Sequence, residues 1–253
     1  SNKLKILNIN LNYKDPFNVE RKKASKFVLK CLDLAHSLAL EAKTAGLVNC
    51  AISKNLLNKQ KIGVTEYLTS KSSLKNDSGV MLIKNNKLSV SPITTHINIK
   101  DISRKLKKEL IINKVKTIEF WYKKKLKKKA KIAILGLNPH NAELRETSEE
   151  RKIIIPAINK LKKLGINVDG PFVSDTIFIN DYKKFDVIVG MFHDQVLSPF
   201  KALFKFNAIN ITLGLKYLRV SPDHGVAKNL IGKNIADSKS LLQCINFINK
   251  FGK

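Results

Sequence analysis

Hydrophobic and polar positions along this chain follow two periods, and each period predicts one kind of element. Apolar residues at helical spacing predict helices at residues 18–46, 99–126, 147–165 and 236–251. Short apolar runs predict buried strands at residues 47–53, 130–139, 185–192 and 208–215. Residues 79–97 add two strands around a turn at Asn85–Asn86. This alternation predicts an α/β protein with a largely parallel sheet covered by helices.

Capping signals mark several of these helix ends. Gly46 follows the first helix, and we expect it to cap the C-terminus there. Thr147 or Ser148 is expected to open the third helix, with acidic residues in its first turn. Asp237 or Ser238 is expected near the cap of the last helix.

Length and composition indicate a globular protein. The chain has 253 residues, of which 43% are hydrophobic, enough for one large domain or two smaller ones. No apolar run approaches the roughly 18 residues that cross a bilayer, and the first ten residues lack the features of a signal peptide. Three widely spaced cysteines suit a reducing compartment and argue against a cysteine-ligated zinc site. We therefore expect a cytoplasmic protein without a membrane partner.

The net charge of +27 allows two interpretations. A polyanion partner such as nucleic acid would explain it. However, most of the charge is lysine, accompanied by abundant Asn and Ile, as the codon bias of an AT-rich genome would produce. Arginine, the usual side chain for bidentate phosphate and base recognition, occurs at five positions only. We favour compositional bias and expect no specific nucleic-acid partner.

Three of the five histidines follow predicted strands: His96, His140 and His193. In open α/β sheets, ligands bind beyond the C-terminal ends of the strands. Three imidazoles with one open position would form a catalytic metal site, with zinc as the first expectation. The carboxylates of Glu143 and Asp194 lie close to two of them in sequence. Three unrelated loop histidines remain the alternative at this point.

Other polar groups have weaker signals. Asp223 and His224 precede a helical segment, where they form either a turn with an N-cap or a ligand contact. Asp175 lies in a Ser-Asp-Thr turn and could also serve as an acid–base group. His36 falls within an amphipathic helix and is expected to be structural. Neither a G-x-G-x-x-G motif nor a P-loop is present, so a standard Rossmann nucleotide site is unsupported.

Four motifs in order, together with TTH at residues 94–96, resemble the 4-hydroxythreonine-4-phosphate dehydrogenase family from about Gly63 to the C-terminus. They read GLNPHNAE, DGPFVSDTIF, MFHDQVLSPFK and NITLGLKYLRVSPDHGVAKNLIGKNIAD. The resemblance implies an α/β fold like that of isocitrate and isopropylmalate dehydrogenases, with two domains and mainly parallel sheets flanked by helices. It places residues 1–60 and 222–253 in one domain, incomplete at its N-terminus relative to the family. Residues 61–221 would form the central domain that carries the metal and substrate site.

The resemblance also implies an activity. It implies metal- and NAD-dependent oxidation and decarboxylation of 4-phosphooxy-L-threonine to 3-amino-2-oxopropyl phosphate, in pyridoxal phosphate (vitamin B6) biosynthesis. The expected cofactors are NAD or NADP and one divalent metal per site, zinc first and magnesium or cobalt as alternatives. The expected assembly is a homodimer whose active site is completed by the second subunit.

The resemblance assigns roles to individual residues. It assigns the metal to His96, His140 and His193. It assigns the substrate to Thr65, Lys201, Asn210 and Arg219, and catalysis to Asp175, Asp194 and Lys201. Asp223 and His224 would border the cofactor.

This sequence departs from the family on its N-terminal side. The glycine-rich motif GDPAGIGPE of the family has no counterpart here, and the segment TGP…K reads NCAISK, which retains Lys54. The motif GHTE, whose His and Thr hold the substrate phosphate, reads GVTE with Val64 in place of histidine. These differences suggest two alternatives: a related dehydrogenase for another phosphorylated hydroxy acid, and a catalytically impaired relative with a binding role.

Overall fold

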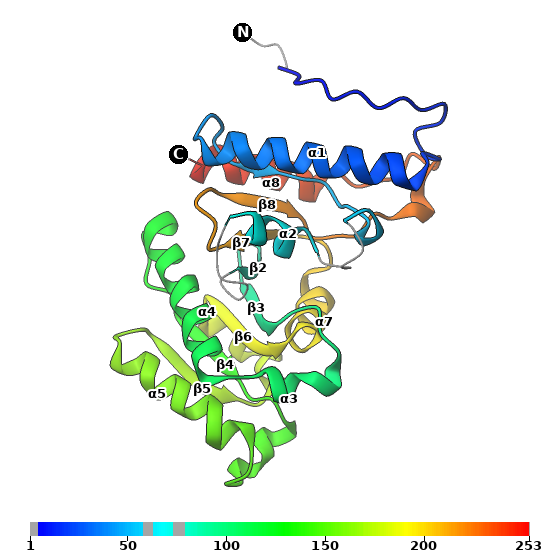
Figure 1. Ribbon diagram of the computed structural model, residues 1–253. Helices are drawn as coiled ribbons and strands as arrows, with labels where there is room; N and C mark the ends of the chain where they lie inside the picture. Colours follow the sequence, from blue (N-terminus) through cyan, green and yellow to red (C-terminus); the bar gives the residue numbers. More distant parts are fainter. Residues whose placement is uncertain (1–4, 58–62, 73–78, 253) are drawn as a thin grey trace.

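A single mixed sheet organises the molecule. The computed structural model describes residues 5–57, 63–72 and 79–252. The described strands form an eight-stranded sheet in the order β1-β8-β7-β2-β3-β6-β4-β5, with helices on both faces (Figure 1). The strands are β1 Leu47–Val48, β2 Val80–Lys84, β3 Ser89–Thr94, β4 Ile132–Leu135, β5 Val168–Phe172, β6 Val187–Phe192, β7 Ile209–Leu213 and β8 Arg219–Pro222. The α-helices are α1 Arg21–Leu40, α2 Val64–Lys71, α3 Ile102–Lys105, α4 Lys108–Trp121, α5 Ile155–Lys163, α6 Ser174–Ile177, α7 His193–Phe204 and α8 Lys239–Phe251.

Strand direction divides the sheet into two parts. From β3 through β6 and β4 to β5, all neighbours are parallel. From β8 through β7 and β2 to β3, all neighbours are antiparallel, and β1 pairs parallel with β8 at the edge. The α/β fold predicted from the sequence is confirmed, and the parallel part brings the C-terminal ends of β3, β6 and β4 to one edge.

Apolar residues on alternating strand positions fill two cores, one on each face. In β6, Val187 and Val189 pack with helices α4 and α5, whereas Ile188 packs on the opposite face with α7. In β4, Ile132 and Ala133 alternate in the same way. This is the period-two pattern of strands that are buried on both faces.

Two predicted helices differ from the structure. The first ends at Leu40, so Gly46 does not cap it. Gly46 instead lies so close to the Leu218 carbonyl that a β-carbon would reach within 2.5 Å of the oxygen. The helix predicted over residues 99–126 is interrupted at Leu106 and Lys107, whose backbone is extended. The third predicted helix begins with a π-helical segment, Glu150–Ile154, that continues into α5. Ser148 does open it, because its hydroxyl accepts a hydrogen bond from the Arg151 N–H at 3.3 Å.

The proposed division into two domains stays a prediction, and its boundary near residue 60 lies outside the described residues. Figure 1 shows α1 and α8 over the β8 end of the sheet, and α4 and α5 beside the β4 and β5 end. No helix among the described residues combines the length and hydrophobicity that a bilayer crossing requires.

Candidate active site

The three candidate ligand histidines follow three neighbouring parallel strands. His96 follows β3, His193 begins α7 directly after β6, and His140 lies in the turn after β4. The structure brings the ends of these three strands to one edge of the sheet, and the expectation that the three imidazoles converge on one metal stays a prediction. We call this set, His96, His140 and His193, the histidine edge.

Two of these histidines lie close together and the third does not join them. The ring centroids of His96 and His193 are 5.9 Å apart. His140 is exposed in residues Pro139–Leu144, where successive residues have left-handed backbone with φ of 46° to 55° from His140 to Glu143. Within the described part of the chain, no group of three His, Cys, Asp or Glu side chains could hold a metal ion. One chain alone thus presents two histidines together at this edge.

Each of the paired histidines has a carboxylate at Nδ1. Glu66 Oε1, from α2, lies 3.1 Å from His96 Nδ1 and also accepts a hydrogen bond from the Thr95 hydroxyl at 3.3 Å. Asp194 Oδ1 lies 2.6 Å from His193 Nδ1. Burial raises the pKa of Glu66, but hydrogen bonds from His96, Thr95 and its own backbone, with the charge of His96, outweigh burial and lower it to about 2. Glu66 was not identified from the sequence.

The histidine pair fits a divalent metal. Ligating histidines usually give their second ring nitrogen to a carboxylate, carbonyl or water, as both rings do here. With Zn–N bonds of about 2.0–2.1 Å in tetrahedral geometry, the centroids of two ligating rings lie roughly 5.2 Å apart. The observed separation of 5.9 Å is somewhat longer, so the two rings would move slightly toward each other to share one ion.

Glu150 holds the start of the loop that carries His140. It is 0% exposed, and its Oε1 accepts hydrogen bonds from the N–H groups of Leu137 at 2.7 Å and Asn138 at 2.8 Å. Its Oε2 accepts a third from the Asn138 side chain at 3.0 Å. Burial raises the pKa of Glu150, but these hydrogen bonds and one from its own backbone hold it below its ordinary value.

Gln195 joins three strand-end segments. Its Oε1 accepts a hydrogen bond from the Met191 N–H at 2.6 Å, at the end of β6. Its Nε2 donates to the Gly136 carbonyl after β4 at 2.6 Å and to the Ser174 hydroxyl of α6 at 2.7 Å. The side chain therefore ties the segment before His193 to the segments that lead to His140 and Asp175.

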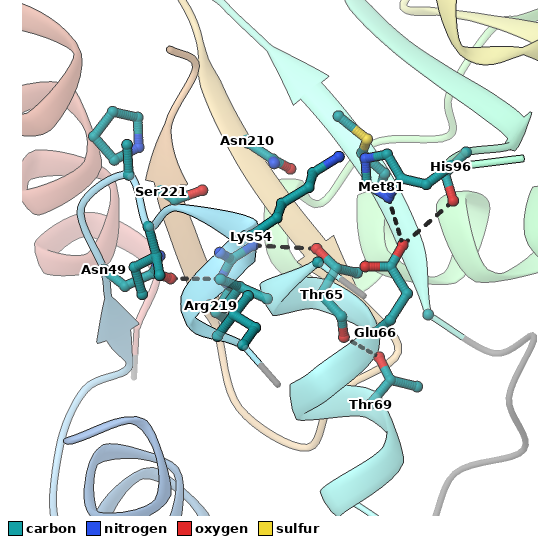
Figure 2. A pocket seen from close by; sticks show the side chains of 18 of the residues that line it. Asn49, Lys54, Thr65, Glu66, Thr69, Met81, His96, Asn210, Arg219 and Ser221 are labelled. Atoms are coloured by element: carbon teal, nitrogen blue, oxygen red, sulfur yellow. Dashed lines mark hydrogen bonds and ion pairs between the residues drawn. The ribbon is translucent and has the colours of Figure 1, made fainter. Parts of the chain in front are cut away.

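A cavity of about 360 Å³ adjoins the histidine edge and collects most of the predicted substrate residues. Thr65, Asn210 and Arg219 line it, as does His96 (Figure 2). His224 lines it as well. Lys54 and Asn49 also line it, although neither was predicted as a site residue. We call the group Lys54, Thr65, Asn210 and Arg219 the anion pocket.

Arg219 is the dominant charge of this pocket. It is 2% exposed, yet its partners are all neutral. Nε donates to Asn49 Oδ1 at 2.9 Å and Nη1 to the Thr65 hydroxyl at 3.3 Å (Figure 2). Nη1 also donates to the Thr212 hydroxyl at 2.8 Å. Burial lowers the pKa of Arg219 to about 10, so it stays charged at neutral pH. Buried charges are normally paired, and no carboxylate of the described residues forms an ion pair with this guanidinium.

Two further groups face the cavity with free hydrogen-bonding capacity. Asn210 Oδ1 is buried and has no hydrogen-bond partner among the described residues. The Lys54 ammonium has no hydrogen bond or ion pair within the same part of the chain, and Figure 2 shows its side chain extending across the pocket. Val64, where the resembling family has histidine, also lines the cavity and offers no side-chain donor.

Lys201 and Asp223 form a pair at the border of the cavity. Lys201 Nζ donates to the Asp223 carbonyl at 3.0 Å and to Asp223 Oδ1 at 3.2 Å. Asp223 is buried, its Oδ2 has no partner among the described residues, and burial raises its pKa against the opposing charge of Lys201. Its neighbours Pro222 and His224 line the cavity, which places the pair at the cavity border.

Asp175 lies apart from these groups. It is exposed in the first turn of α6 and forms no hydrogen bond or ion pair with other described residues. Its link to the site is indirect, through the adjacent Ser174 and the side chain of Gln195.

Comparisons with known proteins agree on one family. The model of the family described as "Pyridoxal phosphate biosynthetic protein PdxA" matches residues 1–248. A 4-hydroxythreonine-4-phosphate dehydrogenase of Sulfurihydrogenibium sp. (strain YO3AOP1) is 42% identical over 234 residues, 90% of this chain and 72% of that protein. The enzyme of the same name from Aquifex aeolicus (strain VF5) is 41% identical over 214 residues, 83% of this chain and 66% of that protein.

A solved structure gives the same result for the fold. The crystal structure of 4-hydroxythreonine-4-phosphate dehydrogenase from Klebsiella pneumoniae superposes with a TM-score of 0.80 at 28% identity. The match covers 94% of this chain and 72% of that one. The chain thus spans 66% to 72% of the length of these three proteins.

Proposed function

The chain belongs to the family of pyridoxal phosphate biosynthetic protein PdxA, and from this premise we propose that it is an NAD-dependent dehydrogenase. Its substrate is 4-phosphooxy-L-threonine, which it oxidises and decarboxylates to 3-amino-2-oxopropyl phosphate in vitamin B6 biosynthesis. The names of the relatives support this reaction over another phosphorylated hydroxy acid and over a binding role without catalysis.

The observation that carries the proposal is the buried guanidinium of Arg219 with neutral partners only. A bound anion would supply the missing counter-charge through charge-assisted hydrogen bonds. Lys54 and the Thr65 hydroxyl lie in the same cavity and would bind the same substrate. Because Val64 cannot donate a hydrogen bond, we assign Lys54 the task of completing the phosphate contacts.

We propose that His96 and His193 bind one divalent metal, zinc by the chemistry of its nitrogen ligands. When bound, the metal would act as a Lewis acid on the substrate and NAD would accept the hydride. Within the chain, Asn210 Oδ1 would accept a hydrogen bond from the substrate. Asp223 holds Lys201 at the cavity border, where its ammonium would contact an anionic group of the substrate.

His140 requires a separate account, because one chain does not bring it to the other two histidines. We propose that the enzyme is a homodimer and that the second copy supplies His140 from its exposed loop. In a symmetric dimer such an exchange is reciprocal and completes two sites at once.

The remaining assignments also stay proposals. Asp194 orients His193 and, with Asp175, is the candidate acid–base group. His224 lines the cavity and, with the adjacent Asp223, would border NAD. The three cysteines are free, which accords with a cytoplasmic location.

An NAD-reduction assay with 4-phosphooxy-L-threonine tests the proposal. We expect NADH to form, a strong chelator to abolish its formation, and added Zn²⁺, Co²⁺ or Mg²⁺ to restore it. His193→Ala should remove activity under every metal condition, because it deletes a ligand from the pair. Metal-loaded protein of native fold that forms no NADH would refute the proposed reaction, and activity indifferent to the chelator would refute the metal.

A further inference from the structure

Adjacent residues of α2 serve both parts of the site. Thr65 accepts a hydrogen bond from Arg219 in the anion pocket, and Glu66 binds His96 at the histidine edge (Figure 2). Glu66 lies in the first turn of the helix, and its Oε1 also accepts from the Thr95 hydroxyl. Both contacts are made by Oε1 to adjacent residues, whereas Oε2 is buried without a hydrogen-bond partner among the described residues.

The contact between Glu66 and His96 decides which ring nitrogen carries the proton. An ionised carboxylate only accepts hydrogen bonds, so a neutral imidazole facing it must donate from Nδ1. Its Nε2 then keeps a free lone pair. A metal binds the unprotonated nitrogen of neutral imidazole, and the hydrogen bond of the other nitrogen selects it.

We propose that Glu66 is a positioning residue that fixes His96 in the Nδ1–H tautomer and makes Nε2 its metal-binding atom. The metal part of this inference rests on the proposed function. Outer carboxylates of this kind orient the ring and raise its basicity, and their loss typically weakens metal binding 10- to 100-fold.

The second histidine–carboxylate pair provides an internal comparison. The Asp194 side chain is 76% exposed, so water competes for its contact with His193, whereas the Glu66 side chain is 33% exposed. A carboxylate that is shielded from water holds its partner more strongly. Removing Glu66 should therefore weaken metal binding more than removing Asp194.

A helix-capping role is the competing explanation for Glu66. Gly63 opens α2 without a side-chain cap, and an acidic residue in the first turn stabilises a helix. Capping alone would lower the melting temperature of Glu66→Ala and leave both the tautomer of His96 and the metal affinity unchanged.

The first arm of the test uses metal-free protein. Long-range ¹H–¹⁵N spectra of histidine-labelled protein, recorded at pH 8 where histidine is ordinarily neutral, report the tautomer of His96, whose signal is assigned from the spectrum of His96→Ala. We expect the Nδ1–H form in the wild type and a shift toward the Nε2–H form in Glu66→Ala. An Nε2–H form in the wild type, or an unchanged spectrum in Glu66→Ala, would overturn the inference.

The second arm measures the affinity for Zn²⁺ alone by calorimetric titration. We expect Glu66→Ala to bind about 10- to 100-fold more weakly, with a smaller loss for Asp194→Asn. Glu109→Gln, which removes an exposed carboxylate of α4, should bind as the wild type does. If Glu66→Ala does not fold, Glu66→Leu, which fills more of the space without a hydrogen-bond acceptor, takes its place. Affinity within twofold of the wild type would overturn the inference. A wild type that binds no Zn²⁺ would refute the proposed metal instead, and the first arm would then decide the tautomer separately.

Discussion

The anion pocket and the histidine edge border one another but differ in how much of each a single chain supplies. The pocket gathers Lys54, Thr65, Asn210 and Arg219 around one cavity. At the histidine edge, His96 and His193 approach each other, while His140 lies in an exposed loop outside any three-ligand group of the described residues. The described residues of one chain thus gather the pocket by themselves, whereas completion of the metal site by a second copy stays a proposal.

The two regions also differ in their local charge balance. Both histidines of the close pair have a carboxylate at Nδ1. Arg219 has neutral partners only, so the pocket carries an excess of positive charge that an anion would neutralise. The metal proposed for the histidine edge and the anion proposed for the pocket match this difference in charge.

Substitution of Arg219 should have the largest effect on the pocket. We expect Arg219→Met to lower kcat/KM about 10²- to 10³-fold, because the substrate anion loses the desolvated positive charge that binds it. Stability should hold or rise, since an unpaired buried charge carries a desolvation cost that an apolar side chain does not. The Thr65 and Thr212 hydroxyls already lie 3.2 Å apart and can hydrogen-bond each other. Steady-state kinetics and thermal unfolding of the same preparation check both expectations.

Lys54→Met removes a second positive charge from the pocket and should have a smaller effect than Arg219→Met. Lys54 is an exposed residue, so its loss should cost about tenfold, mainly in KM, at a contact that water screens. Lys205→Met, at the far end of α7, is the matched lysine control and should leave both constants unchanged. Equal losses for Arg219→Met and Lys54→Met would contradict the leading role of Arg219.

At the histidine edge, Glu150→Gln should destabilise the loop that carries His140. Glutamine has an NH2 group in place of one carboxylate oxygen, so it cannot accept from both the backbone N–H groups and the Asn138 side chain. At neutral pH we therefore expect a loss of about 2 kcal/mol in the free energy of unfolding. The pKa of Glu150 is lower in the folded chain than its ordinary value, so its contribution is present above the unfolded value of about 4.3. That contribution is lost as pH falls through the lower folded pKa.

Urea unfolding at pH 7 and at stepwise lower pH measures this dependence. The gap between wild type and Glu150→Gln should shrink below about pH 4.3. Glu146→Gln, an exposed change in the same segment, should unfold as the wild type does at every pH. A gap that stays constant with pH would mean that the ionised carboxylate does not hold the loop.

The sequence predicted which histidines follow neighbouring strands, but it did not predict the tertiary contacts that surround the site. His96 and His193 could be placed because parallel neighbours end at the same edge of a sheet. Glu66 could not, because it comes from α2 and meets His96 only through tertiary packing. The neighbours of Arg219 come from separate segments, so their convergence depends on the order β1-β8-β7, which periodicity does not contain.

The hydrophobic pattern also failed to predict local features of the backbone within and between helices. Leu106 is buried although its backbone is extended, so the apolar spacing continues across the interruption between α3 and α4. In α7, Pro199 lies inside a helix that begins at His193, although a proline ordinarily argues against a helix at that point of a sequence. The hydrophobic pattern reports which residues are buried and does not locate these features of the backbone.

The most direct test of the account is complementation between two inactive variants. His96→Ala and His140→Ala should each be inactive alone. In a dimer that exchanges His140, each mixed dimer has one intact site, so random reassortment of equal amounts should restore about a quarter of wild-type NAD reduction. A mixture of His96→Ala with His193→Ala should stay inactive, because each site takes both His96 and His193 from one chain. Every site in a mixed dimer then lacks one of the two. No recovery in the first mixture, or equal recovery in both, would contradict the claim that a second copy completes the metal site.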